Sequence, residues 1–91
     1  MKFEWDEAKN QKNKAKHDID FNIAIRAFAD PKRIESYDLE HDEDEERWKL
    51  IGMAVPAVLV VIYTERQDGE VIRLISARQA NGKEKQKYYN R

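Results

Sequence analysis

The chain has 91 residues, which is long enough for one hydrophobic core and too short for two, so we expect a single domain over residues 1–91. Its 17 basic and 18 acidic residues leave a net charge of −1, and the overall charge therefore gives no argument for a nucleic-acid partner. The absence of cysteine excludes a disulfide framework, and the longest apolar run, residues 55–63, is too short to cross a bilayer. We expect a cytoplasmic protein that contacts no membrane.

The charges are distributed unevenly along the chain. Residues 35–46 contain eight acidic side chains, whereas residues 9–16 contain four lysines and no acid. This distribution predicts one surface suited to a polyanion and another that would repel it. The alternative is that these charges only keep helix and loop surfaces solvated.

The N-terminal segment predicts a short strand followed by a polar helix. Residues 3–5 alternate apolar and polar side chains, which favours an edge strand, and Asp6 can cap a helix over about residues 7–17. Little in that helix is apolar beyond Ala8 and Ala15, so most of its surface must face water or a polar partner. We expect it to be held by its neighbours, as a scaffold or as a lysine-rich face for phosphates.

A second helix is predicted after Asp20, which can cap it, and should end near Ala29 because Pro31 disfavours helical geometry before it. Its apolar residues recur at one-face helical spacing: Phe21, Ala24, Ile25 and Phe28. This stripe should pack on the sheet. If the Phe28 ring is fully buried, we expect Phe28→Ala to lower the free energy of unfolding by about 3–5 kcal/mol.

The second half of the chain is dominated by strand patterns. Residues 33–40 predict a weak strand that leads into an acidic loop at residues 41–45, and residues 46–53 alternate charged and apolar side chains. Residues 58–64 and 71–78 are rich in β-branched side chains, which favour strands.

Turn and cap residues complete the predicted fold. Asp68 and Gly69 between the last two strands are typical of a tight hairpin turn, and Asn81 can cap a final helix that extends to about Tyr89. The predicted fold class is α+β, with a short N-terminal strand, two helices, an antiparallel sheet of about four strands and a C-terminal helix.

The residue chemistry permits RNA cleavage without a metal. The sequence contains no phosphate-cradling glycine loop, no exposed-serine elbow and no histidine pair at metal spacing, and we expect no metal and no cofactor. Cleavage by the RNA's own 2′-hydroxyl needs a proton acceptor, a proton donor and fixed cations. His17 can titrate near neutral pH, and Glu46 can be a base if an arginine and partial burial tune it.

Each candidate cation has both a functional and a structural interpretation. Arg47, Arg66 and Arg78 can clamp a phosphate with paired donors, or form ordinary ion pairs with acidic neighbours. His17 can instead cap helix carbonyls, and Tyr63 can be packed in the sheet. Strict alternation places Ser76 and Arg78 on one sheet face and Arg73 on the other, so the arginines share a site only if a bulge or twist intervenes.

A set of short motifs runs in order along nearly the whole chain. In the first half they are Phe3-Glu4-Trp5-Asp6, Lys9-Asn10, Asn13, Lys16-His17, Phe21, Ala24, Phe28 and Asp30-Pro31. In the second half they are Glu45-Glu46-Arg47-Trp48, Gly52, Tyr63-Thr64-Glu65-Arg66, Arg73, Ile75-Ser76-Ala77-Arg78, Ala80, Glu84 and Tyr88. This ordered set resembles the BrnT family of bacterial toxins.

The resemblance implies a toxin of a type II toxin–antitoxin system with a RelE-like fold, a metal-independent endoribonuclease that cleaves RNA and inhibits translation. It implies a BrnA-like antitoxin of the ribbon-helix-helix kind, with which we expect a heterotetramer that reaches operator DNA only through the antitoxin. The predicted catalytic residues are His17, Glu46, Arg66 and Arg78. The predicted substrate-binding residues are Lys16, Arg47, Arg73 and Tyr63. Either His17 or Glu46 can be the acid or the base.

The chain departs from the family pattern at a few positions. Asp18 stands where a glycine usually follows the histidine, so the turn after the first helix must use an aspartate in a less comfortable conformation. Gln79 replaces a common basic residue, and Gly82 weakens the first turn of the last helix. The rival hypothesis is a non-catalytic binding module that acts only in a partner or repressor complex.

Overall fold

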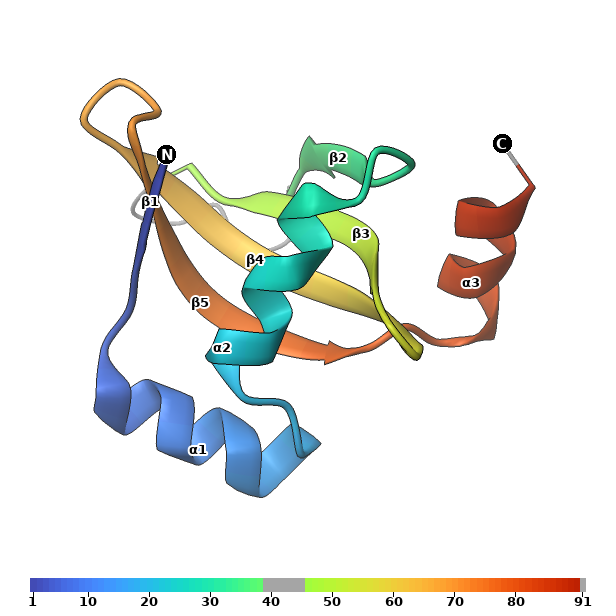
Figure 1. Cartoon of the computed structure of the whole chain (residues 1–91), viewed down its shortest axis with the longest axis horizontal. Helices are drawn as coiled ribbons and strands as arrows, with labels where there is room; N and C mark the ends of the chain where they lie inside the picture. The colour runs from blue at the N-terminus through green and yellow to red at the C-terminus, as the bar shows by residue number, and fades with distance from the viewer. Residues whose placement is uncertain (39–45, 91) are drawn as a thin grey trace.

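Five strands form one sheet in the computed structural model, which describes residues 1–38 and 46–90 (Figure 1). They are β1 (Lys2–Glu4), β2 (Ile34–Tyr37), β3 (Trp48–Ala54), β4 (Ala57–Arg66) and β5 (Val71–Gln79). Their order across the sheet is β1-β5-β4-β3-β2, with β1 parallel to β5 and the other neighbours antiparallel. The α+β class is confirmed, but the sheet is mixed and five-stranded because the first strand pairs with the last.

Four helical segments surround the sheet in the described part of the chain. They are α1 (Glu7–His17), α2 (Phe21–Ala24), the 3-10 segment η1 (Ile25–Ala29) and α3 (Gly82–Tyr89). The predicted caps are confirmed, because the side chains of Asp6, Asp20 and Asn81 each accept hydrogen bonds from the first amides of a helix. The predicted second helix is α-helical for one turn only and continues as 3-10 turns.

Left-handed backbone conformations occur at two turns, after α1 and in the β4–β5 hairpin. Asp18 ends α1 with φ 60° and ψ 31°, in the position where a glycine would be unstrained. In the β4–β5 hairpin, Gln67, Asp68 and Gly69 have φ values of 53°, 55° and 87°. The predicted Asp-Gly turn is therefore confirmed.

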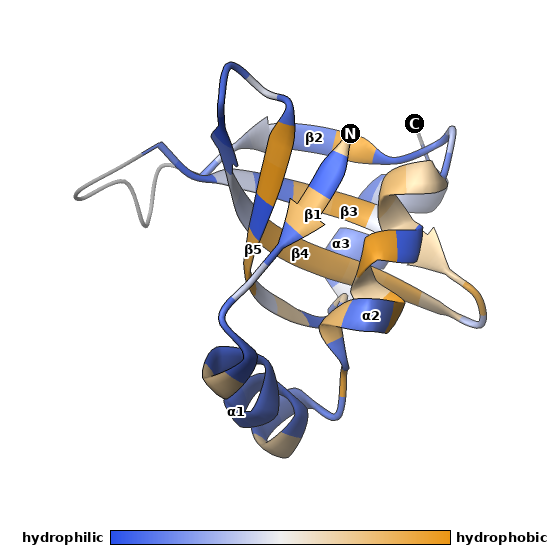
Figure 2. Cartoon of the chain, turned by 60° about the vertical axis from the view of Figure 1, so that its left-hand side comes forward, coloured by the Kyte–Doolittle hydropathy of each residue, from blue (hydrophilic) through white to orange (hydrophobic). Residues whose placement is uncertain are grey.

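Two buried asparagines hold α1, which Figure 2 shows to be hydrophilic over almost its whole length, against the rest of the molecule. The Asn13 amide donates to the carbonyls of Ile19 and Ala77 (2.9 and 2.8 Å), and its oxygen accepts from the Ala77 amide (3.0 Å). Asn10 accepts from the Phe21 amide at 2.9 Å. The Asn13 side chain therefore forms with β5 the same pair of hydrogen bonds that the backbone of a neighbouring strand would form.

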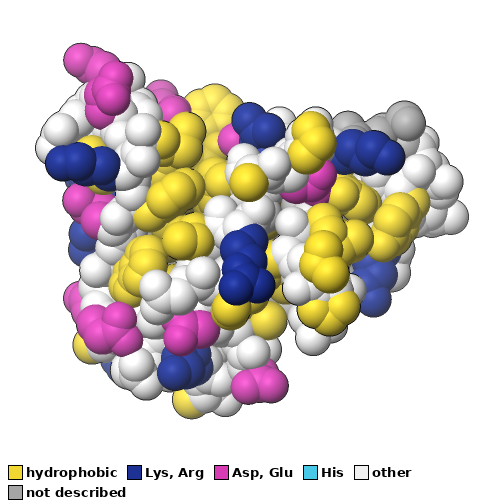
Figure 3. Space-filling view, in the orientation of Figure 1, with side chains coloured by type: hydrophobic (Ala, Val, Ile, Leu, Met, Phe, Trp, Pro, Cys, Tyr) yellow, Lys and Arg dark blue, Asp and Glu magenta, His cyan; other side chains and the backbone are white. Residues whose placement is uncertain are grey.

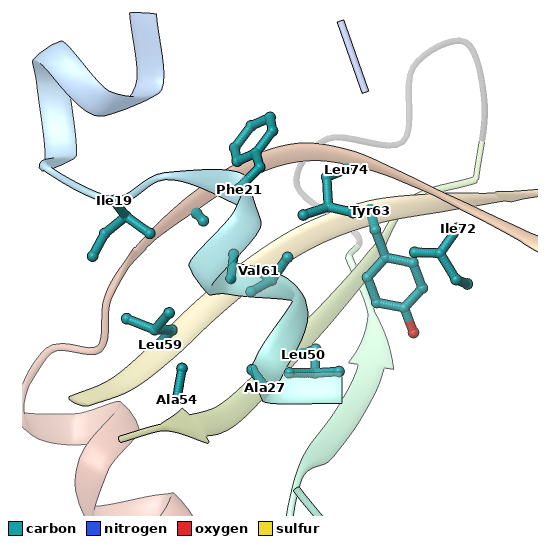
Figure 4. Packing of buried hydrophobic residues seen from close by; sticks show 12 residues of the cluster. Ile19, Phe21, Ala27, Leu50, Ala54, Leu59, Val61, Tyr63, Ile72 and Leu74 are labelled. Atoms are coloured by element: carbon teal, nitrogen blue, oxygen red, sulfur yellow. The ribbon is translucent and has the colours of Figure 1, made fainter. Parts of the chain in front are cut away.

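The main core lies between the sheet and the α2–η1 layer. From outside, this face carries hydrophobic side chains among interspersed acids and bases (Figure 3), and beneath them α2 and η1 cover β4 (Figure 4). Phe21 is fully buried, whereas Phe28 is half-buried, with its ring edge-on to Phe3 and Tyr63. The destabilisation expected for full burial therefore applies to Phe21, and we expect a smaller one at Phe28.

A smaller core lies on the other face, where α3 packs against one end of the sheet. Tyr88 and Ala80 bury Ile51, Val58 and Val60 there. The rest of that face is left to the polar and basic side chains described below.

Three expectations remain, which concern the acidic loop, a membrane span and a metal site. The predicted acidic loop, residues 41–45, lies outside the described residues. In the part that is described, no helix is long and apolar enough to cross a membrane. Nor do the described histidines, aspartates and glutamates form a group of three or more that can hold a metal ion.

Candidate functional site

A bulge in β5 decides which side chains share a sheet face. The β4–β5 pairing shifts by one residue, so that Ile75 is left without a cross-strand partner. Because partners on neighbouring strands point to the same face, the shift places Arg73, opposite Thr64, on the face that carries Ser76 and Arg78. Strict alternation predicted that Arg73 lies on the opposite face, and that prediction was wrong because of the bulge.

The same pairing brings further cations to this face. Lys49 pairs with Ile62, which pairs in turn with Ser76, and Arg66 lies two residues beyond Thr64 on β4. The face is the one turned away from α2 and η1. We call it the cationic face; among the described residues, the strands and the residue before β3 give it the basic side chains Lys2, Arg47, Lys49, Arg66, Arg73 and Arg78.

One end of the cationic face gathers three of the predicted site residues. Arg73 Nη1 donates to Glu4 Oε2 at 2.7 Å, and the neighbouring Thr64 hydroxyl donates to the Glu46 carbonyl at 2.7 Å. Arg47 follows Glu46 directly, and its buried Nε has no hydrogen-bond acceptor among the described residues. The Arg47 side chain is half-buried, and a guanidinium group has five N–H donors that suit an anionic oxygen.

At the other end, Glu84 of α3 holds two cations. Its carboxylate accepts from Arg78 Nη1 and Nη2 at 2.8 and 2.9 Å, and Lys49 Nζ lies 3.0 Å from Oε2. The hydrogen bonds from Arg78, then those from the Asn81 amide and Lys49, lower the pKa of Glu84 to about 2 against the effect of burial.

Lys16 and His17 lie at the edge of the sheet rather than on its face. They line a hollow of about 220 Å³ between α1 and β5, together with Lys9 and Lys12. Ser76 lines the same hollow and also belongs to the cationic face, because it pairs with Ile62. The hollow and the face therefore meet at Ser76.

The structure does not bring all the predicted residues together. Arg66 and Arg78 pair with Val71 and Val60, and six residues of extended β4 separate those positions, which is about 20 Å. Arg78 is also turned toward Glu84, so Arg66 and Arg78 do not form one clamp here. Glu46 and His17 likewise lie on opposite sides of β4 and β5.

Tyr63 lies on the other face of the sheet. Its ring packs edge-on against Phe28, with 5.1 Å between the centroids, and its hydroxyl donates to Glu35 Oε1 at 2.9 Å. Burial raises the pKa of Tyr63 above its usual value, and the Glu35 carboxylate raises it further. The predicted substrate-binding tyrosine is therefore a core residue that does not reach the cationic face.

Sequence reasoning missed two residues of this arrangement. Lys49, the second residue of β3, lies two residues after Arg47, a spacing that predicted one shared face but gave no partner for Lys49. Glu84 is the third helical residue of a capping box with Asn81. The sequence predicted Asn81 as the cap but not Glu84 as its partner.

Comparison with known families agrees with the motif order. A family model described as ribonuclease toxin, BrnT, of type II toxin–antitoxin system matches residues 5–84. No curated protein matches the chain. The match extends from Trp5, the residue before the Asp6 cap, to Glu84, and so includes Arg47, Lys49, Arg66, Arg73 and Arg78 of the cationic face. The chain belongs to the BrnT family of ribonuclease toxins, whose type II systems imply an antitoxin protein as its partner.

Proposed function

We propose that this toxin is a metal-independent endoribonuclease that binds RNA across the cationic face. The observation that carries the proposal is the β5 bulge, which gathers Arg73 and Arg78 on one face with Arg47, beside the basic hollow at His17. Fixed guanidinium groups can stabilise the charge that grows on a phosphate during cleavage. The opposite face of the sheet packs against α2 and η1 in the main core, which fixes the backbone that carries these cations.

The reaction is an internal transesterification. A base removes the proton of a ribose 2′-hydroxyl, and the 2′-oxygen then forms a bond to the adjacent phosphorus. The bond from phosphorus to the 5′-oxygen breaks as an acid donates a proton to that oxygen. The products are a 2′,3′-cyclic phosphate and a 5′-hydroxyl, with no co-reactant consumed.

Phosphate binding is centred on Arg47 and Arg73. Arg47 is half-buried, and its guanidinium has N–H donors besides the buried Nε–H, which has no acceptor among the described residues. Such donors can pair with a phosphate oxygen. Glu46 adjoins this pair through the Thr64 hydroxyl, whereas His17 borders the hollow beyond β5. One of them acts at the scissile link and the other contacts a flanking nucleotide.

The pH dependence of cleavage assigns these two roles. Glu46→Gln should remove one limb of the rate profile if Glu46 is the base, and His17→Asn should remove one limb if the histidine transfers the proton. A variant of the flanking residue should instead change KM with little change in the shape of the profile.

The proposed antitoxin, fold family and cellular compartment follow from the resemblance to the BrnT family. The proposed antitoxin is a BrnA-like ribbon-helix-helix protein that forms a heterotetramer with the toxin and carries all contact with operator DNA. The fold is proposed to be RelE-like, and the site of action is the cytoplasm.

The test is incubation of purified toxin with single-stranded RNA in a chelator, followed by identification of the fragment ends. Arg47→Ala should lower the cleavage rate by about 10²–10³-fold, as loss of one fixed transition-state donor does. Arg26→Ala, on the helix-covered side, is the matched control and should cleave like the wild type. Intact RNA at high toxin concentration, with antitoxin binding retained, would select the non-catalytic binding module instead.

A further inference from the structure

One carboxylate joins cations from two strands that are not neighbours. Lys49 belongs to β3 and Arg78 to β5, with β4 between them, and Glu84 bridges the gap from α3. Across the sheet the two positions are separated by two strand spacings, about 10 Å. Without the bridge, each side chain would sample several rotamers over the open face.

Glu84 is more deeply buried than the two cations that it binds. The Glu84 side chain is 10% exposed, whereas the Lys49 and Arg78 side chains are 32% and 39% exposed. The anion therefore lies beneath the cations, which reach the surface. Two positive charges against one negative charge leave the group with a net charge of +1, so it still attracts a phosphate.

The Glu84 side chain is itself held in place by the N-terminal cap of α3. Its Oε1 accepts from the Asn81 amide at 2.8 Å, and its own amide donates to Asn81 Oδ1 at 2.9 Å, which ties the carboxylate to the start of α3. A carboxylate that imitated substrate would be expected to be exposed and able to move aside. This one is buried and anchored.

We propose that Glu84 is a positioning residue that holds Lys49 and Arg78 as one rigid cationic pair for the RNA phosphates, which makes Lys49 a substrate-binding residue. This inference rests on the proposed ribonuclease function. A guanidinium that is already oriented by a bidentate carboxylate loses little freedom when a phosphate arrives, so its charge acts fully in the transition state. The Lys49 ammonium has three donors, which leaves donors for RNA after Glu84 accepts one.

The central variant is Glu84→Gln. Glutamine keeps an acceptor for the capping box but removes the charge that orients both cations. We expect kcat to fall at least tenfold, whereas KM for RNA should stay the same or decrease because a negative charge has gone. Glu70→Gln removes the same charge from an exposed glutamate in the β4–β5 turn and should leave both constants unchanged.

Two further variants separate positioning from folding. Arg78→Lys keeps the charge and leaves the Glu84 capping bond in place, but cannot form the bidentate pair, so it should reproduce the kcat loss. Combined with Glu84→Gln, it should add little further loss, because both changes break one interaction. Lys49→Ala should raise KM and reduce the salt dependence of RNA binding by about one phosphate contact, whereas Lys83→Ala should do neither.

The outcomes are distinguishable. In wild-type toxin, nitrogen-15 NMR should show the Arg78 guanidinium with restricted rotation, and in Glu84→Gln with averaged signals. Cleavage by Glu84→Gln at the wild-type rate, or faster with tighter binding, would overturn the positioning role while leaving the ribonuclease function intact. A wild-type toxin that cleaves no RNA would overturn the proposed function, and this inference with it.

Discussion

Asn13 is the residue on which the attachment of α1 depends, and Asn13→Ala tests it. The side chain is 7% exposed and makes three hydrogen bonds to backbone groups, two of them to Ala77 of β5. At a net contribution of about 1 kcal/mol for each bond, the variant should lose about 3 kcal/mol of the free energy of unfolding. That is a large share of the roughly 5–14 kcal/mol expected for a domain of this size.

Urea unfolding at pH 7, followed by circular dichroism, measures this loss. With a slope of about 1.5 kcal/mol/M, the midpoint should fall by about 2 M. Asn22→Ala makes the same change at an exposed asparagine whose side chain bonds no described residue but Asp20, and should shift the free energy of unfolding by less than about 0.5 kcal/mol. Hydrogen exchange at the Ala77 amide should accelerate only in the Asn13 variant. Equal midpoints for the two variants would refute this account of how a polar helix is held.

Three other predictions concern stability. Gly52→Ala should destabilise the protein by about 1–3 kcal/mol in chemical denaturation, because a Cβ there would lie 2.8 Å from the Ala27 carbonyl oxygen; an unchanged midpoint would contradict this packing. Asp18→Gly should stabilise the protein by up to about 1 kcal/mol, because glycine adopts the left-handed cap without strain and the change removes an anion from the end of α1. The Tm should therefore rise, and a lower Tm would contradict this prediction. Folding lowers the pKa of Glu84 from 4.5 to about 2, so the contribution of Glu84 to the free energy of unfolding is present above pH 4.5 and is lost as the pH falls from about 4.5 toward 2. Urea midpoints over that pH range should therefore drop more steeply for wild type than for Glu84→Gln, and parallel curves would refute the assignment.

Much of the fold was predictable because its causes are local. Asp6, Asp20 and Asn81 cap their helices through contacts within three residues, and the Asp68–Gly69 turn depends only on backbone preference. The parallel pairing of β1 with β5 joins residues about 70 positions apart and has no local pattern. The sequence therefore predicted the elements well and the sheet incompletely.

The site was less predictable for the same reason. No glycine or proline marks the bulge at Ile75, so alternation along the sequence placed Arg73 on the wrong face. Asn13 looked like one more polar residue of a solvated helix, because its buried partners are provided by β5 and by the turn after α1. The pairing of Lys49 with Glu84 joins β3 to the last helix, which no spacing in the sequence indicates.

The central claim is that RNA lies on the cationic face, and arginine side-chain NMR tests it most directly. The probe is a single-stranded RNA whose 2′-hydroxyls carry methyl groups, so that it binds without being cleaved. On titration, the Nε–Hε signals of Arg47 and Arg73 should shift, whereas those of Arg26 and Arg33, on the helix-covered side, should stay in place. Shifts at Arg26 and Arg33 with unmoved Arg47 and Arg73 signals would contradict the claim.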